Sequence, residues 1–200
     1  KLWSSIDQPN RKLGTLLNSI KKEIDKYDLL WSVLEDIDTN TWVIEPEAPS
    51  RSCCMRRIAL DSFAFLKVEF DPTEPMKIPE FHFLGIDSVI GPLRQRLYAN
   101  LSAWDSARLP RENLERILQI TFPTKQSQTK EALSIECGIC YSYRLESMVP
   151  DFVCQNPPCS KPFHQKCLSN WLLLTPDTHT TFNTIFGSCP YCGSSIHVSA

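Results

Sequence analysis

The sequence predicts an α+β lobe followed by a small domain that is held together by metal ions. Three observations support this architecture. A helical stripe of apolar residues near the start is followed by four short strands and two further helices. A polar, turn-rich stretch then separates this lobe from the rest of the chain. Seven of the nine cysteines lie beyond that stretch, from Cys137 to Cys192.

The first expected element is an amphipathic helix over residues 11–37. Its apolar side chains recur at steps of three and four residues, which places them on one face. They are Leu13, Leu16, Leu17, Ile20, Ile24, Tyr27, Leu30, Trp31 and Leu34. Charged residues occupy the opposite face, so we expect this stripe to pack on a sheet.

A four-stranded meander is expected next. Segments rich in β-branched and aromatic residues, bounded by turn-forming residues, predict strands at 41–45, 56–60, 63–70 and 80–84. A proline-rich loop at 70–79 separates the last two strands. Helices are predicted at 93–104 and, after Pro110, at 111–120. A helix, a meander and further helices together make an α+β layer.

We assign residues 1–122 to the lobe, 123–134 to a linker and 135–200 to the cysteine-rich domain. The last domain is short and has few large apolar side chains, so it could hardly sustain a core without metal. Clustered C-x-x-C pairs with a histidine among them are typical of metal binding in a reducing compartment rather than of secreted disulfides. We therefore expect the protein in the nucleus and cytoplasm.

Composition gives no support for two classes of partner. The net charge is -2 and the pI is about 6.1, which gives no electrostatic reason to expect direct nucleic-acid binding. No apolar stretch approaches the roughly 18–20 residues that a membrane span needs. Protein partners are the expectation that remains.

The cysteine-rich domain has the spacing C-x2-C-x13-C-x4-C-x4-H-x2-C-x21-C-x2-C. Its eight candidate ligands are Cys137, Cys140, Cys154, Cys159, His164, Cys167, Cys189 and Cys192. Eight ligands satisfy two tetrahedral Zn²⁺ ions and leave no open position for a metal-bound water, so we expect two structural zinc ions.

The ligand pairs could be used sequentially or in a cross-brace. The long gaps of 13 and 21 residues resemble those of cross-braced domains. In that arrangement one ion is held by Cys137, Cys140, His164 and Cys167, and the other by Cys154, Cys159, Cys189 and Cys192. Spacing alone leaves both arrangements open.

This C4HC3 ligand order occurs both in RING domains and in PHD fingers. The residues between the ligands resemble the RING surface that docks a ubiquitin-conjugating enzyme, with an apolar residue in the first knuckle, a tryptophan on a short helix and a proline in the last knuckle. The candidate docking residues are Ile139, Tyr141, Trp171, Leu172 and Pro190. Exposed aromatic and aliphatic side chains of this kind suit a protein-binding hot spot.

A non-enzymatic PHD-like module that binds a protein or a histone tail is the alternative. A PHD finger usually has an aromatic residue two positions before its seventh ligand, where this sequence has Gly187. The RING interpretation is therefore preferred.

Several motifs together closely resemble the Fanconi anaemia ubiquitin ligases, the L subunit of that DNA-repair pathway. They are Cys-Gly-Ile-Cys-Tyr, Pro-Phe-His-Gln-Lys-Cys, Asn-Trp-Leu and Phe-Gly-Ser-Cys-Pro-Tyr-Cys in the cysteine-rich part, and Thr-Trp-Val-Ile-Glu-Pro-Glu and Arg-Arg-Ile-Ala-Leu upstream. The resemblance implies that the lobe is the second lobe of an RWD-like domain, a relative of the ubiquitin-conjugating fold. The family's N-terminal regions are absent, so we expect part of a longer protein.

The same resemblance implies a function. A RING-type E3 ligase would recruit a ubiquitin-loaded conjugating enzyme, while the lobe holds the protein substrate for (mono)ubiquitination in crosslink repair, within a larger complex. Ile78, Phe83 and Leu84 correspond to apolar positions of the family's substrate-binding patch. Strand alternation adds Trp42 and Ile44, which share one side of the first strand.

No catalytic nucleophile is expected, because a RING ligase acts by proximity and orientation. The remaining thiols, Cys53 and Cys54, lie in or beside a strand and are interpreted as core or edge residues. We interpret His82, His179 and His197 as structural or solvent-facing.

Gly193 and Ser194 stand where many active RING domains have a basic residue, which favours dependence on one preferred conjugating enzyme or on partner subunits.

Overall fold

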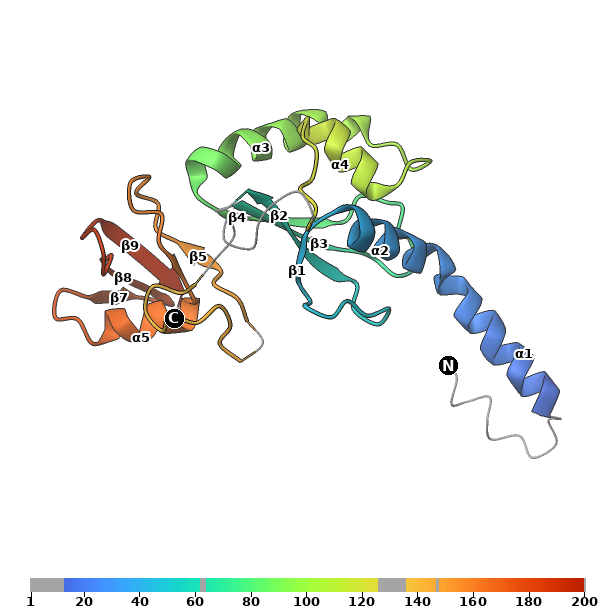
Figure 1. The fold of residues 1–200 in the computed structure, drawn as a ribbon, viewed down its shortest axis with the longest axis horizontal. Helices are drawn as coiled ribbons and strands as arrows, with labels where there is room; N and C mark the ends of the chain where they lie inside the picture. Colours follow the sequence, from blue (N-terminus) through green and yellow to red (C-terminus); the bar gives the residue numbers. More distant parts are fainter. Residues whose placement is uncertain (1–12, 62–63, 126–135, 147, 200) are drawn as a thin grey trace.

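The structure, a computed structural model, describes residues 13–61, 64–125, 136–146 and 148–199. An antiparallel sheet with helices on one face forms the lobe, and a smaller C-terminal domain of short strands and one helix follows (Figure 1). The expected α+β lobe followed by a small domain is confirmed. Among these residues no helix is both long enough and apolar enough to cross a membrane.

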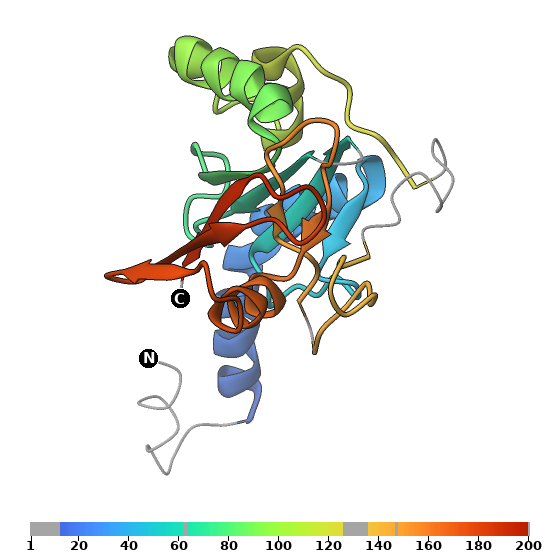
Figure 2. The same ribbon diagram turned by 90° about the vertical axis from the view of Figure 1, so that its left-hand side faces the viewer.

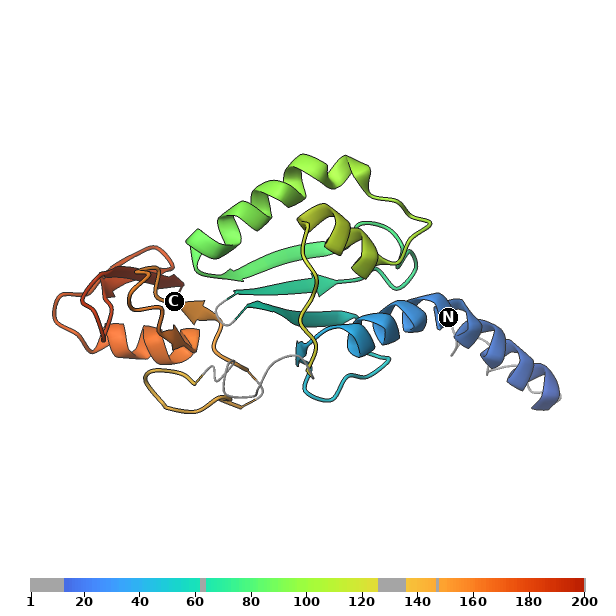
Figure 3. The same ribbon diagram turned by 45° about the horizontal axis from the view of Figure 1, so that its top comes forward.

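The expected first helix is divided into two by a 3-10 turn at Asp25–Tyr27. Helix α1 (Leu13–Ile24) has no buried residue and projects away from the lobe (Figures 1 and 3). Helix α2 (Asp28–Asn40) buries Leu30, Val33, Leu34 and Ile37. The expectation that the whole stripe packs on the sheet is therefore wrong for α1. Periodicity identifies an apolar face but does not specify what covers it.

The sheet is the expected meander. Strands β1 (Val43–Glu45), β2 (Met55–Asp61), β3 (Ala64–Glu69) and β4 (Glu80–Gly85) pair in the order β1-β2-β3-β4, all antiparallel. Phe63, at the expected start of the third strand, lies outside the described residues. Trp42 and Ile44 pack on one side of the sheet and Val43 on the other, which confirms the predicted alternation.

Two helices follow the sheet. Helix α3 (Asp87–Asn100) continues into a 3-10 turn at Leu101–Ala103, and α4 spans Pro110–Leu118. Helix α3 begins six residues earlier than predicted because the chain accommodates Pro92 inside the helix, although proline usually disrupts a helix interior.

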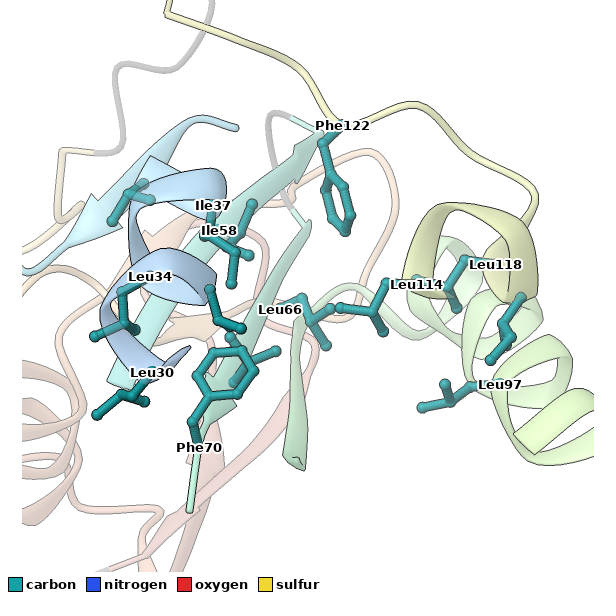
Figure 4. Packing of buried hydrophobic residues seen from close by; sticks show 14 residues of the cluster. Leu30, Leu34, Ile37, Ile58, Leu66, Phe70, Leu97, Leu114, Leu118 and Phe122 are labelled. Carbon is teal, nitrogen blue, oxygen red and sulfur yellow. The ribbon is translucent and has the colours of Figure 1, made fainter. Parts of the chain in front are cut away.

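The main core lies between the sheet and helices α2, α3 and α4 (Figure 4). It includes Leu30, Leu34 and Ile37 from α2, Ile58 and Leu66 from the sheet, and Leu97, Leu114 and Leu118 from α3 and α4. Burying each such side chain contributes about 1.5–3 kcal/mol. The opposite face of the sheet has a smaller apolar cluster formed by Ile44, Ala59 and Phe65 together with Val149 of the C-terminal domain.

The described residues of the C-terminal domain form two small sheets and one helix, α5 (Gln165–Leu173). Strands β5 (Phe152–Val153) and β6 (Pro162–Phe163) pair with each other, and β7 (His179–Thr181), β8 (Thr184–Ser188) and β9 (Ser195–Ser199) form a second antiparallel sheet. Helix α5 packs on β8 and β9 through Leu168 and Leu172. Most of the expected linker, residues 126–134, lies outside the described residues.

Candidate metal centres and docking surface

The eight candidate ligands form two groups of four. One contains Cys137, Cys140, His164 and Cys167, and the other contains Cys154, Cys159, Cys189 and Cys192. Within each group the ligand atoms all lie within 4.8 Å of one another. The first group joins the first and third pairs of the sequence, and the second joins the second and fourth. This grouping is that of the cross-brace, which the spacing had left open.

The distances within each group fit a tetrahedral zinc ion. With Zn–S bonds of about 2.3 Å, two sulfur ligands lie about 3.8 Å apart along a tetrahedral edge. The Sγ atoms of Cys154 and Cys192 are 3.7 Å apart, and those of Cys159 and Cys189 are 3.9 Å apart. A disulfide would require about 2.05 Å, and all nine cysteines are free thiols.

His164 faces its group through Nδ1. This atom lies 3.4 Å from Sγ of Cys140 and 3.8 Å from Sγ of Cys167. His164 is buried and stands at the junction of β6 and α5 in the chain. Sγ of Cys137 accepts hydrogen bonds from the backbone N–H groups of Ile139, at 3.5 Å, and His164, at 3.4 Å. Both donors are backbone groups in or next to members of the same ligand group, so backbone contacts hold the Cys137 sulfur in place.

The thiols have different proton affinities. Burial raises the pKa of Cys167 to about 12. Hydrogen bonds from the Ser194 and Asn156 side chains lower the pKa of the exposed Cys192 to about 6. A bound divalent cation favours the thiolate in every case, so metal binding would release protons from the buried members of each group.

Gly193 occupies a left-handed turn directly after the last ligand. Its φ is +69°, and its N–H donates to the Cys189 carbonyl at 3.0 Å. This conformation favours glycine over a residue with a side chain. The glycine that stands here in place of a basic residue therefore suits the local backbone conformation.

Four of the five candidate docking residues are accessible. Tyr141 and Trp171 are 73% and 46% exposed, and Ile139 and Pro190 are half-buried at the two knuckles. Leu172, in contrast, is fully buried in the core of the C-terminal domain. We correct its assignment from docking residue to core residue, because neighbouring positions of α5 point in different directions, so that Trp171 faces solvent and Leu172 faces the core.

Comparison with known proteins agrees with this geometry. The family model described as the FANCL UBC-like domain 3 matches residues 29–125, and the model of the FANCL C-terminal domain matches residues 133–200. The chain belongs to the FANCL family. The resemblance to the Fanconi anaemia ligases and the ubiquitin-conjugating-like fold of the lobe are thereby confirmed.

Three relatives in the FANCL family show the extent of the match. The mouse protein "E3 ubiquitin-protein ligase FANCL" is 39% identical over 188 residues, covering 94% of this chain and 50% of the mouse protein. The Drosophila melanogaster protein of that name is 27% identical over 94% of this chain and 51% of its own length. A crystal structure of FANCL matches 99% of this chain and 55% of its own, with a TM-score of 0.73 and 26% identity. The chain spans about half the length of the curated relatives it matches.

Gly187 distinguishes this FANCL-type domain from a PHD finger on steric grounds. A Cβ added there would lie 2.7 Å from Cδ2 of Leu172 and 3.1 Å from Oγ1 of Thr178. Since Leu172 is fully buried, the position has no room for the aromatic residue of a PHD finger.

Sequence reasoning missed Tyr191, the residue between Pro190 and the last ligand. Its hydroxyl donates to the Gly138 carbonyl at 2.7 Å, and so joins the last knuckle to the first. Gly138 leaves room for this contact, because an added Cβ would lie 2.9 Å from the Tyr191 ring. The neighbouring Tyr141 hydroxyl, followed by burial, raises the pKa of Tyr191. The sequence feature that could have indicated this contact is the aromatic residue within the last C-x-x-C turn.

The five predicted substrate-binding residues do not form one surface. Trp42, Ile44 and Leu84 lie together beside Val149 on the sheet face that meets the C-terminal domain, and Ile44 is buried there. Phe83 packs against the main core on the other side. Ile78 is exposed in the loop before β4, in a hollow that also contains Trp104.

The remaining thiols and histidines lie outside both ligand groups. Cys53 and Cys54 are half-buried just before β2, and burial raises the pKa of Cys54. His82, His179 and His197 are exposed. His179 and His197 flank Phe186 on the C-terminal sheet, with ring centroids 5.1 and 5.7 Å from it.

Proposed function

We propose that this chain is the part of an E3 ubiquitin ligase that recruits a ubiquitin-loaded conjugating enzyme. The observation on which this rests is a set of exposed apolar side chains positioned by two four-ligand groups. Ile139 and Pro190 lie in the two knuckles, which Tyr191 joins, and Trp171 lies on α5 just after the ligand Cys167. The name of the mouse and fly relatives, E3 ubiquitin-protein ligase, supports the same proposal.

Two structural Zn²⁺ ions are part of this proposal. Cys137, Cys140, His164 and Cys167 would hold one ion, and the other four cysteines the second. Bound zinc would supply the link between loops that otherwise have few apolar contacts. Four protein ligands fill each tetrahedral site.

The chain's own residues would act by positioning. The conjugating enzyme brings ubiquitin as a thioester, and the amine of a substrate lysine attacks the thioester carbonyl, forming an isopeptide bond and releasing the enzyme's thiol. Ile139, Tyr141, Trp171 and Pro190 would hold the enzyme near that lysine, so the rate gain comes from proximity and orientation. No nucleophile of this chain enters the reaction.

The substrate side is proposed to be the lobe. Of the predicted residues, Trp42 and Leu84 are half-buried at the edge of the cluster beside Val149, and Ile78 is exposed. We propose (mono)ubiquitination of a protein substrate in DNA crosslink repair, within a larger complex in the nucleus and cytoplasm.

Replacing Trp171 tests the docking surface. Removing a central aromatic anchor costs at least about 2 kcal/mol of binding, or roughly 30-fold in affinity. We expect Trp171→Ala to lose most of its stimulation of ubiquitin discharge across a panel of conjugating enzymes. Phe182→Ala is the control, because Phe182 is 98% exposed at the turn between β7 and β8. If the wild type stimulates no enzyme of the panel, the proposal is wrong.

A further inference from the structure

At the centre of the contact between the two domains, a charged pair of the lobe binds the backbone of the dipeptide Val149–Pro150 of the C-terminal domain. Arg57 on β2 and Glu45 on β1 form an ion pair with a 3.1 Å N–O distance. Arg57 also donates to the Pro150 carbonyl at 2.8 Å, and the Val149 N–H donates to Glu45 at 3.4 Å. Each member of the pair therefore bonds one backbone group of the dipeptide.

The side chain of Val149 packs into an apolar cluster of the sheet, between these polar contacts. It is 1% exposed and packs with Ile44, Ala59 and Phe65 of the sheet. The Arg57 guanidinium lies over the Phe65 ring, 4.9 Å from its centroid, and the Arg57 side chain is 4% exposed. Both the apolar and the charged contacts are thus shielded from water, where hydrogen bonds to charged groups contribute more than at a surface.

We call the contacts of Arg57 and Glu45 with Val149–Pro150 the clamp. Further contacts between the two domains lie on either side of it. Arg144 donates to the Ile44 carbonyl at 3.2 Å and pairs with Glu47. At the other end of the sheet, Gln155 accepts from the Asp87 N–H at 2.8 Å and donates to the Gly85 carbonyl at 3.2 Å. Figure 2, with the C-terminal domain toward the viewer, shows this domain in front of the sheet. Contacts at these three separated places restrict both rotation and translation of the C-terminal domain relative to the lobe.

We propose that Arg57, Glu45 and Val149 are positioning residues that hold the C-terminal domain in one orientation on the lobe. This inference rests on the proposed ligase function, because its consequence is for ubiquitin transfer. A conjugating enzyme docked on Trp171 and Ile139 would then face one direction relative to the lobe. Only lysines within reach of that direction would receive ubiquitin, since proximity and orientation govern the transfer.

The first measurement concerns the orientation itself. Spin labels introduced as noncanonical amino acids at exposed Ser106 in the lobe and Thr180 in the C-terminal domain report the distance between the domains. We expect one narrow distance distribution in the wild-type chain and a broad one in Val149→Asp. Met148→Asp is the matched control, because the neighbouring Met148 is 45% exposed.

The second measurement concerns the reaction. Mass spectrometry would give the relative ubiquitin occupancy of lobe lysines, among them Lys21, Lys67 and Lys77, after reaction with a loaded conjugating enzyme. Discharge onto free lysine, which needs docking but no fixed lobe, is measured in parallel. We expect Val149→Asp to change the occupancy ratios severalfold while discharge onto free lysine stays within twofold of wild type. Val149→Ile, which keeps an apolar side chain at this position, should keep the wild-type ratios.

Glu45→Gln is the second variant, used if Val149→Asp fails to retain two zinc ions per chain. It keeps the size of the side chain and removes the charge opposite Arg57, so we expect intermediate broadening. A broad distance distribution in the wild type, or an unchanged distance and lysine pattern in both variants, would overturn the inference. If the wild type stimulates no conjugating enzyme, the proposed function fails, while the distance measurement still decides whether the clamp fixes the domains.

Discussion

The lobe and the C-terminal domain differ in the size and composition of their buried cores. Among the described residues of the lobe, fourteen buried apolar residues form one core, contributed by three helices, the sheet and the segments that follow β3 and α4. The C-terminal domain buries far fewer aliphatic side chains, and three of its nine buried core residues are the ligands Cys137, Cys154 and Cys189. Burial of apolar area therefore stabilises the lobe, whereas the C-terminal domain has fewer apolar contacts and places two groups of candidate metal ligands at its centre.

Removing metal should produce the largest difference between the two parts. Structural zinc contributes an apparent free energy of about 10–16 kcal/mol. We expect chelation to unfold the C-terminal domain and leave the lobe folded, as followed by zinc content and by NMR spectra of the amides of both parts. Returning Zn²⁺ should restore the spectrum. A C-terminal domain that keeps its native spectrum without metal would contradict this comparison.

A core substitution in α2 should have the next largest effect. Leu34 is 2% exposed, so Leu34→Ala should lower the free energy of unfolding of the lobe by about 2–5 kcal/mol through lost burial and a cavity. Leu17→Ala, in the same apolar stripe but 55% exposed on α1, should change it by no more than about 0.5 kcal/mol. Denaturant titration of both variants measures the difference, and equal losses would show that α1 is buried in solution.

The smallest expected effect concerns the bond between the two knuckles. Tyr191→Phe removes only the hydroxyl that donates to Gly138, which is worth about 0.5–1.5 kcal/mol. We expect conjugating-enzyme affinity to fall by up to about tenfold with zinc content unchanged. Tyr98→Phe is the control, because Tyr98 is 70% exposed on the lobe. Unchanged affinity in Tyr191→Phe would show that zinc alone positions Ile139 and Pro190.

Local patterns predicted the strands, the position of α4 and the eight ligands, because each depends on residues close in sequence. The start of α3 was predicted too late, at residue 93, whereas the helix continues through Pro92, a residue that usually disrupts a helix interior. The directions of neighbouring side chains on α5 could be assigned only from the structure. Trp171 and Leu172 are adjacent in sequence, but Trp171 faces solvent and Leu172 faces the core.

By itself, the sequence determined the two-part architecture, the strand order and the candidate metal ligands, since periodicity and short ligand spacings express local geometry. Only the tertiary structure decided that α1 stands free of the sheet, that the four ligand pairs interleave, and that Val149 is seated beside Ile44. Glu45 and Arg57 meet Val149 and Pro150 across roughly a hundred residues of chain. No local pattern encodes such contacts, because they depend on how complete faces pack against one another.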